Sequence, residues 1–244
     1  YMPFFSQEPV PAKLDIPELF VGVTPSSPPL IYKEGERIVG LEVDLATALG
    51  ESLGMPVRFV ELDWQDQIPA LEKGKIDIIM SGMSITQTRS YRIDFCDPYF
   101  RSGQMMLVDI ANANQYPRGY YDLKWKKDIR IGVVDATTGD YFARKNLPKA
   151  LLKGYTTTDQ AVNGLIRGNI DAFIGDAPMI AYAASMNESR GVVPIYTLLT
   201  EEYLAWGVRK EDKALQRRAN EFFKEYKKDG RLESILRKWV PYLN

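Results

Sequence analysis

The feature of this chain that most constrains its fold is an internal repeat. Residues 70–82 (ALEKGKIDIIMSG) align without gaps on residues 164–176 (GLIRGNIDAFIGD), with Leu, Gly, Ile and Asp in register. A second, weaker match sets residues 21–24 (VGVT) against residues 131–134 (IGVV). The separation is too long for a stacked array, whose units run to about 20–50 residues. The repeat therefore predicts two similar lobes.

Hydrophobic patterning predicts that strands and helices alternate in both lobes. We expect strands at residues 19–23, 57–60, 76–80, 129–134 and 170–174. We expect helices at residues 43–53, 65–73, 138–146, 159–167 and 177–186, and two amphipathic helices, 215–228 and 232–239, on either side of Gly230. Alternation of this kind is typical of parallel β-α-β units. The predicted fold class is α/β, with two similar lobes built on mixed, mainly parallel sheets.

Composition excludes several function classes. The chain carries 31 Lys and Arg against 32 Asp and Glu, so it has no basic excess for nucleic-acid binding. It has no His, and its single cysteine, Cys96, excludes an intrachain disulfide and a Cys/His zinc site. We expect no metal and no cofactor. Residues 1–17 hold four prolines and are predicted to form an extended arm.

Four loops are candidates for one ligand site. In open parallel sheets, ligands bind beyond the carboxyl ends of the strands. The repeat therefore selects Ser81 and Gly82 in one lobe, and residues 175–176 in the other. Residues 24–27 and 135–138 follow the first strands of the two lobes. We expect these loops to face each other across a cleft.

In the first lobe, Arg89 is the candidate for binding a carboxylate. Thr86 is a good N-cap for a short helix, which places Arg89 in the first turn beside the loop. The planar guanidinium of arginine matches a carboxylate. Ser84 adds a hydroxyl, and Gly82 allows a ligand to approach the backbone. The alternative is that Arg89 is a solvated helix residue.

In the second lobe, Thr138 and Gly139 open a helix whose free N–H groups attract anions. Thr137 or Thr138 can also act as a simple N-cap. Asp176 has two interpretations that the sequence leaves open. Its carboxylate either caps the helix at residues 177–186 or binds an ammonium group. An arginine, a helix N-terminus and an aspartate together match a zwitterionic α-amino acid.

At this point several motifs resemble a known family. They are residues 40–45 (GLEVDL), Trp64 with residues 68–71 (IPAL), residues 76–77 (ID), residues 81–86 (SGMSIT), Arg89, and residues 94–99 (DFCDPY). In this order and spacing they resemble the polar amino-acid-binding proteins of ABC importers. These are family 3 solute-binding proteins with the type II periplasmic-binding fold. The resemblance runs from about residue 19 to the end of the chain.

The resemblance implies a domain organisation. Residues 1–99 and 204–244 would form lobe 1, and residues 100–203 would form lobe 2, with the ligand cleft between them. The chain would cross between the lobes near residues 99–103 and 201–204. These two crossings would form a two-strand hinge, and closure about it would trap the ligand.

The resemblance also implies site roles. Arg89 would pair with the ligand α-carboxylate, helped by Ser84 and the backbone of Thr138 and Gly139. Asp176 would bind the α-amino group, beside the Ser81 and Gly82 carbonyls. Trp64 would lie against the ligand side chain. This chain departs from the family at three further candidates, which are Thr24, Ser27 and Asp135.

The departures bear on which side chain is bound. Thr24 and Ser27 stand where the family often has an acidic residue and an aromatic residue, so the aromatic contact is expected from Trp64 alone. Asp135 stands where relatives carry Lys or Gln. It either suits a cationic or amide side chain or is a solvated loop acid.

The resemblance implies a non-enzymatic, periplasmic or otherwise extracytoplasmic protein. It would be a monomer that delivers a free α-amino acid with a polar or cationic side chain to a membrane ABC permease. A removed signal peptide is expected, and a lipid anchor on the precursor stays open. Two alternatives are a ligand-sensing module of a receptor and a cyclohexadienyl dehydratase-like enzyme. Met179 argues against the enzyme, because that enzyme family has an acidic residue there.

Overall fold

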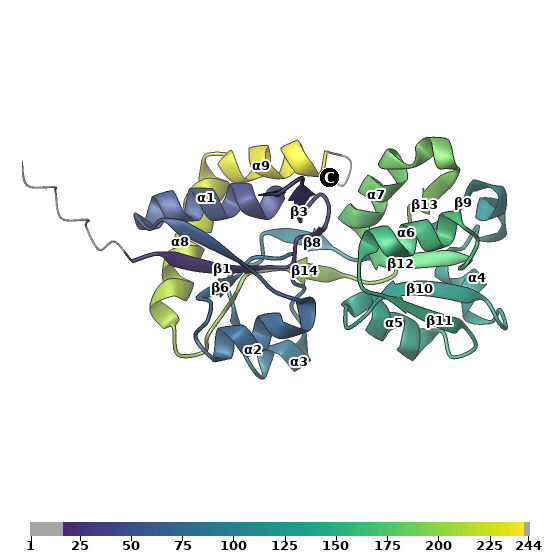
Figure 1. The fold of residues 1–244 in the computed structure, drawn as a ribbon, viewed down its shortest axis with the longest axis horizontal. Coiled ribbons are helices and arrows are strands. Elements are labelled where there is room, and N and C mark those ends of the chain that lie inside the picture. The colour runs from purple at the N-terminus through teal and green to yellow at the C-terminus, as the bar shows by residue number, and fades with distance from the viewer. Residues whose placement is uncertain (1–16, 242–244) are drawn as a thin grey trace, which may run out of the picture.

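The computed structural model describes residues 17–241, so the predicted arm at residues 1–17 lies outside the described residues except for Pro17. Two five-stranded sheets lie side by side, and helices cover both faces of each (Figure 1). No helix in residues 17–241 combines the length and the apolar character needed to cross a membrane. The predicted α/β class with two mixed sheets is confirmed.

The first sheet has the strand order β5-β1-β6-β15-β7. Strands β1, β5 and β6 are parallel, and β15 runs antiparallel to β6 and β7. Separate apolar clusters fill its two faces, one under α1, α8 and α9 and one under α2. The bounds are β1 Leu19–Val23, β5 Val57–Glu61, β6 Ile78–Ile79, β7 Asp94–Phe95, β15 Gly207–Val208, α1 Leu41–Leu53, η1 Trp64–Asp66 (a 3₁₀ helix), α2 Gln67–Glu72, α3 Gln87–Ser90, α8 Lys213–Lys228 and α9 Arg231–Trp239.

The second sheet has the order β11-β10-β12-β9-β13 and the same design. Strands β10, β11 and β12 are parallel, and β9 runs antiparallel to β12 and β13. One apolar cluster packs under α6 and α7 and the other under α4 and α5. The bounds are β9 Gln104–Asp109, β10 Arg130–Val134, β11 Leu151–Tyr155, β12 Ala172–Asp176, β13 Val192–Ile195, η2 Ile110–Gln115, α4 Tyr120–Lys124, α5 Thr138–Asn146, α6 Thr158–Ile166, α7 Ala177–Met186 and η3 Glu188–Arg190.

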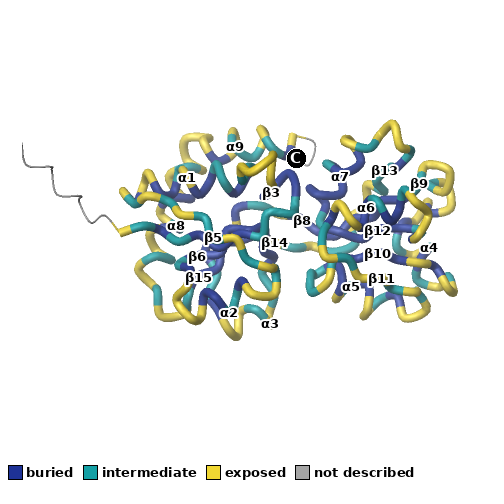
Figure 2. The backbone as a smooth tube through the Cα atoms, in the orientation of Figure 1, coloured by how far each residue is buried: buried dark blue, intermediate teal, exposed yellow. Residues whose placement is uncertain are grey.

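The burial of the strands follows from this layering. The central strands are buried and the outward sides of the helices are exposed (Figure 2). Met106, Leu107 and Val108 on β9 are completely buried, because helices cover both faces of the strand. A strand of this kind shows a continuous apolar run in place of alternation.

The internal repeat has a physical basis in the packing of each lobe. A Cβ atom at Gly22 on β1 would lie 2.3 Å from Cδ1 of Ile76, and one at Gly132 on β10 would lie 2.4 Å from Cδ1 of Ile170. The repeated isoleucine therefore packs against the backbone of the first strand in each lobe. The glycine on that strand, Gly22 or Gly132, leaves the space that the isoleucine fills.

The repeated aspartate holds the same first strand. Oδ2 of Asp77 accepts the backbone N–H of Phe20 at 2.9 Å, and Oδ2 of Asp171 accepts that of Arg130 at 2.8 Å. These bonds satisfy an N–H group at the start of each strand, which would otherwise lack a partner. Leu, Gly, Ile and Asp recur because each lobe needs the same helix end, turn and strand contact.

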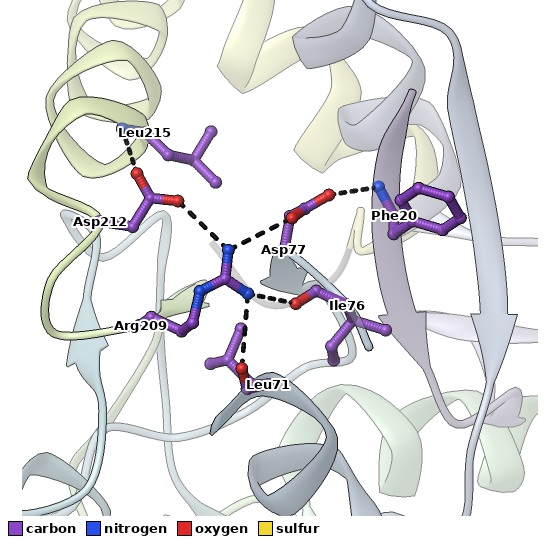
Figure 3. A network of polar contacts seen from close by, with 7 residues as sticks. All are labelled: Phe20, Leu71, Ile76, Asp77, Arg209, Asp212 and Leu215. Atoms are coloured by element: carbon purple, nitrogen blue, oxygen red, sulfur yellow. Dashed lines mark hydrogen bonds and ion pairs between the residues drawn. The ribbon is translucent and has the colours of Figure 1, made fainter. Parts of the chain in front are cut away.

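Arg209 extends this aspartate contact to the C-terminal part of the chain (Figure 3). Its Nη1 donates to the Ile76 carbonyl at 2.6 Å, and its Nη2 lies 3.3 Å from Oδ1 of Asp77 and 3.6 Å from Oδ2 of Asp212. Asp212 in turn caps α8 by accepting the N–H of Leu215. The network fixes the returning chain to the first sheet.

Two crossing strands connect the sheets. Strand β8 (Phe100–Ser102) pairs antiparallel with β14 (Glu202–Leu204). They lie at the two expected crossings, although the exact domain boundaries of 99/100 and 203/204 stay a prediction. A small three-stranded sheet, β2 (Ser26–Ser27), β3 (Ile31–Glu34) and β4 (Arg37–Val39), follows β1 and was not anticipated from the sequence.

Several predicted bounds need correction. The strands at 19–23 and the helices at 138–146 and 177–186 are confirmed residue for residue. The strand expected at 170–174 lies at Ala172–Asp176, because Ile170 and Asp171 are used in the contacts described above. The strand expected at 76–80 shortens to Ile78–Ile79 for the same reason. The helix expected at 65–73 divides into η1 and α2.

Candidate functional site

A cavity of about 710 Å³ lies between the two sheets and receives residues from both. Its lining includes ten of the eleven residues that the sequence indicated: Thr24, Ser27, Trp64, Ser81, Gly82, Ser84, Arg89, Asp135, Thr138 and Asp176. The eleventh, Gly139, lies behind the lining. It is buried, and a Cβ there would lie 2.5 Å from Oε1 of Gln104.

The loop after β6 is held by its backbone. Gly82 has a φ of 68°, in the left-handed region that favours glycine. Its N–H donates to Oε1 of Glu42 at 2.9 Å, and a Cβ would lie 2.8 Å from Cδ1 of Leu30. Ser81 Oγ accepts the N–H of Thr24 at 2.8 Å, which joins this loop to the one after β1.

The hydroxyl of Thr24 serves the scaffold. Its Oγ1 donates to the Leu62 carbonyl at 2.8 Å and accepts from Nε2 of Gln67 at 2.9 Å. Both of its ordinary hydrogen-bonding functions are therefore engaged within lobe 1. The structure thus gives Thr24 a positioning role at the cavity wall, and the ligand contact expected from the sequence stays a prediction.

Arg89 is positioned by a short capped helix. Oγ1 of Thr86 accepts the backbone N–H of Arg89 at 3.1 Å, which confirms the predicted N-cap of α3. The guanidinium donates through Nη1 to the Ser84 carbonyl at 2.7 Å, and its Cζ lies 5.4 Å from the centre of the Trp64 ring. The group has five N–H donors in a plane, so donors remain for a ligand.

Burial lowers the pKa of Arg89, and nearby Asp176, Tyr141 and Glu202 act in the opposite direction. An arginine stays charged in proteins under these conditions. Among the described residues that line the cavity, Arg89 is the single Lys or Arg side chain. The interpretation of Arg89 as a freely solvated helix residue is therefore wrong.

Trp64 lies on η1 of lobe 1 and reaches lobe 2. Its Nε1 donates to the Ala136 carbonyl at 3.0 Å, across the cleft. A second contact crosses the cleft at its edge, where the rings of Tyr32 and Tyr182 lie 6.0 Å apart between centroids. These contacts hold the two lobes against each other around the cavity.

Asp176 ends β12 and occupies the N-cap position of α7, but its side chain makes no capping hydrogen bond. Of the two interpretations left open by the sequence, helix capping is therefore wrong. The carboxylate instead accepts a hydrogen bond from Nε2 of Gln104. Burial and the nearby Glu202 carboxylate raise the pKa of Asp176 to about 7, against the opposing effects of Gln104 and Arg89.

The start of α5 forms the opposite wall. Oγ1 of Thr137 accepts the N–H of Asp140 at 3.4 Å, so Thr137 is the N-cap. Thr138 follows, and its Oγ1 accepts a hydrogen bond from Nε2 of Gln104 at 3.0 Å. Both threonines line the cavity. The free N–H groups of this nine-residue helix favour an anion here.

The remaining wall is acidic. Glu61, Asp63, Asp66 and Asp135 line the cavity in addition to Asp176. Lys33 pairs with Glu61 at 2.9 Å, and both side chains are exposed. Asp135 is also exposed, so its two interpretations, ligand contact and solvated loop acid, both stay open.

Three polar residues near the site were not predicted from the sequence to belong to it. Gln104 is fully buried at the start of β9 and bonds to Asp176, Thr138 and Glu202. Glu42 is fully buried on α1 and accepts hydrogen bonds from Gly82, Tyr99 and Trp206. For Gln104, the available sequence signal was a single glutamine directly before the apolar run at residues 105–108. Glu202 gave no comparable signal, because it lies in a polar segment.

The comparisons with known proteins agree with one another. The family model of the bacterial extracellular solute-binding proteins, family 3, matches residues 19–242. A probable histidine-binding protein of Neisseria gonorrhoeae is 30% identical over 214 residues, covering 83% of this chain and 75% of that protein.

Two solved structures have closely similar folds. One is an ancestral amino acid-binding protein described as a precursor of cyclohexadienyl dehydratase, at a TM-score of 0.86 and 36% identity, covering 91% of this chain and 95% of that one. The other is a putative binding component of an ABC transporter from Wolinella succinogenes complexed with lysine. Its TM-score is 0.87 and its identity 31%, with the same coverage of 91% and 95%.

Proposed function

The chain belongs to the bacterial extracellular solute-binding proteins, family 3, and on this premise we propose that it captures a free α-amino acid in the cavity between its lobes. It then delivers the amino acid to a membrane ABC permease. The observation that carries the proposal is that Arg89 from lobe 1 and Asp176 from lobe 2 line one cavity. An amino acid carries the two opposite charges that such a pair would bind.

The carboxylate of the ligand lies between Arg89 and the start of α5. The guanidinium offers two parallel N–H groups, a geometry that matches a carboxylate. Ser84, next to it, and the N–H group at Thr138 complete the contact, whereas Gly139, expected here from the sequence, lies behind the cavity lining. This arrangement is supported by the bond of Arg89 to the Ser84 carbonyl, which fixes the guanidinium at the wall.

The ammonium of the ligand binds Asp176, with the Ser81 and Gly82 carbonyls as further acceptors. The side chain then extends along Trp64 toward the acidic wall. Four carboxylates in that wall favour a polar or cationic side chain. The lysine complex of the Wolinella relative is consistent with this class.

Hinge closure retains the ligand. Strands β8 and β14 are the crossings about which the lobes would rotate, and the hydrogen bond between Trp64 and Ala136 forms only when the lobes are together. A ligand that bridges Arg89 and Asp176 contacts both lobes, and therefore stabilises the closed arrangement over the open one.

We propose a binding protein without catalytic activity. Met179 lines the cavity at the place where the dehydratase family has an acidic residue, and a thioether cannot donate a proton. The proposed setting is extracytoplasmic, as for the family, with the protein acting as a monomer. A lipid anchor and a place within a receptor are separate hypotheses that the permease role does not need.

A thermal-shift screen against the twenty common amino acids tests the function. A ligand at 1,000 times its Kd stabilises a protein by about 4 kcal/mol, which raises the Tm of a chain of this size by about 8–16 °C. We expect lysine, arginine, histidine or glutamine to raise Tm most. No shift with any amino acid would contradict the proposal. A shift confined to apolar amino acids would contradict the proposed role of the acidic wall.

A further inference from the structure

Behind the proposed ammonium contact, the carboxylates of Asp176 and Glu202 both accept hydrogen bonds from the buried amide of Gln104. Nε2 of Gln104 donates to Asp176 Oδ1 and also to Oε2 of Glu202, at 2.7 Å. Both carboxylate oxygens lie within one hydrogen-bond length of the same nitrogen, so they are within roughly 6 Å of each other. Glu202 belongs to the crossing strand β14, and among the described residues it does not line the cavity.

The amide of Gln104 cannot satisfy this cluster. Its nitrogen has two hydrogens but three acceptors, because Thr138 Oγ1 lies 3.0 Å away. Its Oε1 is buried and has no hydrogen-bond partner among the described residues. A proton on the Asp176 carboxyl would remove one negative charge and supply the missing donor.

The balance of charges around Asp176 also favours a bound proton in the ligand-free protein. Asp176 and Glu202 contribute two negative charges, and Arg89 is the nearby cation. When the ligand carboxylate neutralises Arg89, two carboxylates remain for one ammonium group. In the ligand-free protein no ammonium is present, so the cluster has an unbalanced buried negative charge, which is costly.

We propose that Glu202 is a charge-setting residue of the ammonium subsite, whose carboxylate holds a proton on Asp176 in the free protein, and that Asp176 loses this proton when the ligand ammonium enters. This inference rests on the proposed function. The proton leaves the carboxyl oxygen for a buffer base, and an N–H of the ligand ammonium takes its place as the hydrogen-bond donor. No other group changes its charge.

The surrounding groups agree with this assignment. Burial, with the Glu202 carboxylate as the next cause, raises the pKa of Asp176 to about 7. The other groups that face the pair are Arg89 on α3, Tyr99 before β8 and Tyr141 on α5, with Glu42 behind Tyr99. The pKa of Tyr99 is raised far above neutral by its burial and by Glu42, so Tyr99 does not titrate in this range.

The test is calorimetric titration with L-lysine at pH 6, 7 and 8, in two buffers of different ionisation enthalpy. Both ammonium groups of lysine keep their protons over this range. We expect the wild-type protein to release about half a proton at pH 7, and to bind about 10-fold more tightly at pH 8 than at pH 6. L-glutamine replaces lysine as the probe if lysine does not bind.

Glu202→Gln and Glu201→Gln form a matched pair of variants. Glu202→Gln removes the charge beside Asp176, so the pKa of Asp176 should fall and the affinity should depend less on pH between 6 and 8 than in the wild type, while burial still raises that pKa. Glu201 is the exposed neighbour that pairs with Arg101, and Glu201→Gln should retain the wild-type pH profile. Circular dichroism verifies that both variants fold. If Glu202→Gln does not fold, the wild-type proton count decides alone.

The outcomes separate two failures. Binding of lysine or glutamine by the wild-type protein without proton release, or with the same pH profile in Glu202→Gln, would overturn this inference and leave the proposed function standing. Binding of none of the twenty common amino acids at pH 8 would overturn the proposed function, and this inference with it.

Discussion

Replacing Arg89 with alanine should separate ligand binding from stability. The guanidinium contacts its own protein through the Nη1 bond to the Ser84 carbonyl and through the Trp64 ring at 5.4 Å. The first is worth about 0.5–1.5 kcal/mol net and the second about 0.5–1 kcal/mol. Removing Arg89 also relieves the cost of burying its charge. We therefore expect the free energy of unfolding of the ligand-free protein to change by about 1 kcal/mol or less.

Ligand affinity should fall far more. A hydrogen bond to a charged group contributes about 1.5–3 kcal/mol, and a guanidinium fork makes two of them with a carboxylate. Their loss, about 3–6 kcal/mol, corresponds to a 10²- to 10⁴-fold weaker Kd. Calorimetric titration gives the affinity, and urea unfolding of the ligand-free protein gives the stability.

Arg92→Ala is the matched control. Arg92 lies three residues further along and forms an exposed pair with Glu72 at 2.6 Å, outside the cavity lining. An exposed pair contributes little, so both affinity and stability should stay close to the wild type. Unchanged affinity in Arg89→Ala, or equal losses of affinity in the two variants, would refute the assignment of Arg89 to the carboxylate.

Three further predictions concern the cleft, the buried acid and the backbone. Trp64→Phe keeps the ring but loses the 3.0 Å bond to Ala136, so ligand dissociation should be about 2- to 10-fold faster by stopped flow, whereas Trp125→Phe, at an exposed site, should have no effect. The folded-state pKa of Asp176 is raised above its ordinary value of 3.8 to about 7, so native Asp176 keeps a proton that the unfolded chain has lost, and stability falls as pH rises between these values. The difference in free energy of unfolding between Asp176→Asn and the wild type, measured with urea, should therefore be more favourable to the variant at pH 8 than at pH 5. Equal differences at the two pH values would contradict this. Gly40→Ala places a Cβ 2.4 Å from the Leu30 carbonyl oxygen at a φ of 129°, and should cost about 2–4 kcal/mol, whereas Gly54→Ala, at a φ of 66° with free space, should cost about 1 kcal/mol, and similar costs would refute the steric argument.

The sequence predicted the parts of the fold that local patterns specify. The repeat located the loop at Ser81 after β6 and the end of β12 at Asp176, because the same turn and the same isoleucine contact occur in each lobe. Helix α5 was correct because Thr137 is a local N-cap signal. These features depend on residues a few positions apart.

The features that were not predicted depend on contacts between residues that are far apart in the sequence. Strand β9 lies between β12 and β13, so every one of its ladder bonds joins segments far apart in the sequence. Gln104, the first residue of that strand, bonds to Thr138, Asp176 and Glu202, which lie 34, 72 and 98 residues away. No local pattern reveals such a cluster. Glu42 lies in the motif at residues 40–45, but its buried role was not predicted, since the donors that satisfy it come from three other segments.

A crystal structure of the protein grown with L-lysine would show both charged contacts of the ligand at once. We expect one lysine between the lobes, with its α-carboxylate on the Arg89 guanidinium, its α-ammonium on Asp176 and its side chain along Trp64. A ligand bound in the reverse orientation, or electron density for lysine outside this cavity, would contradict this expectation.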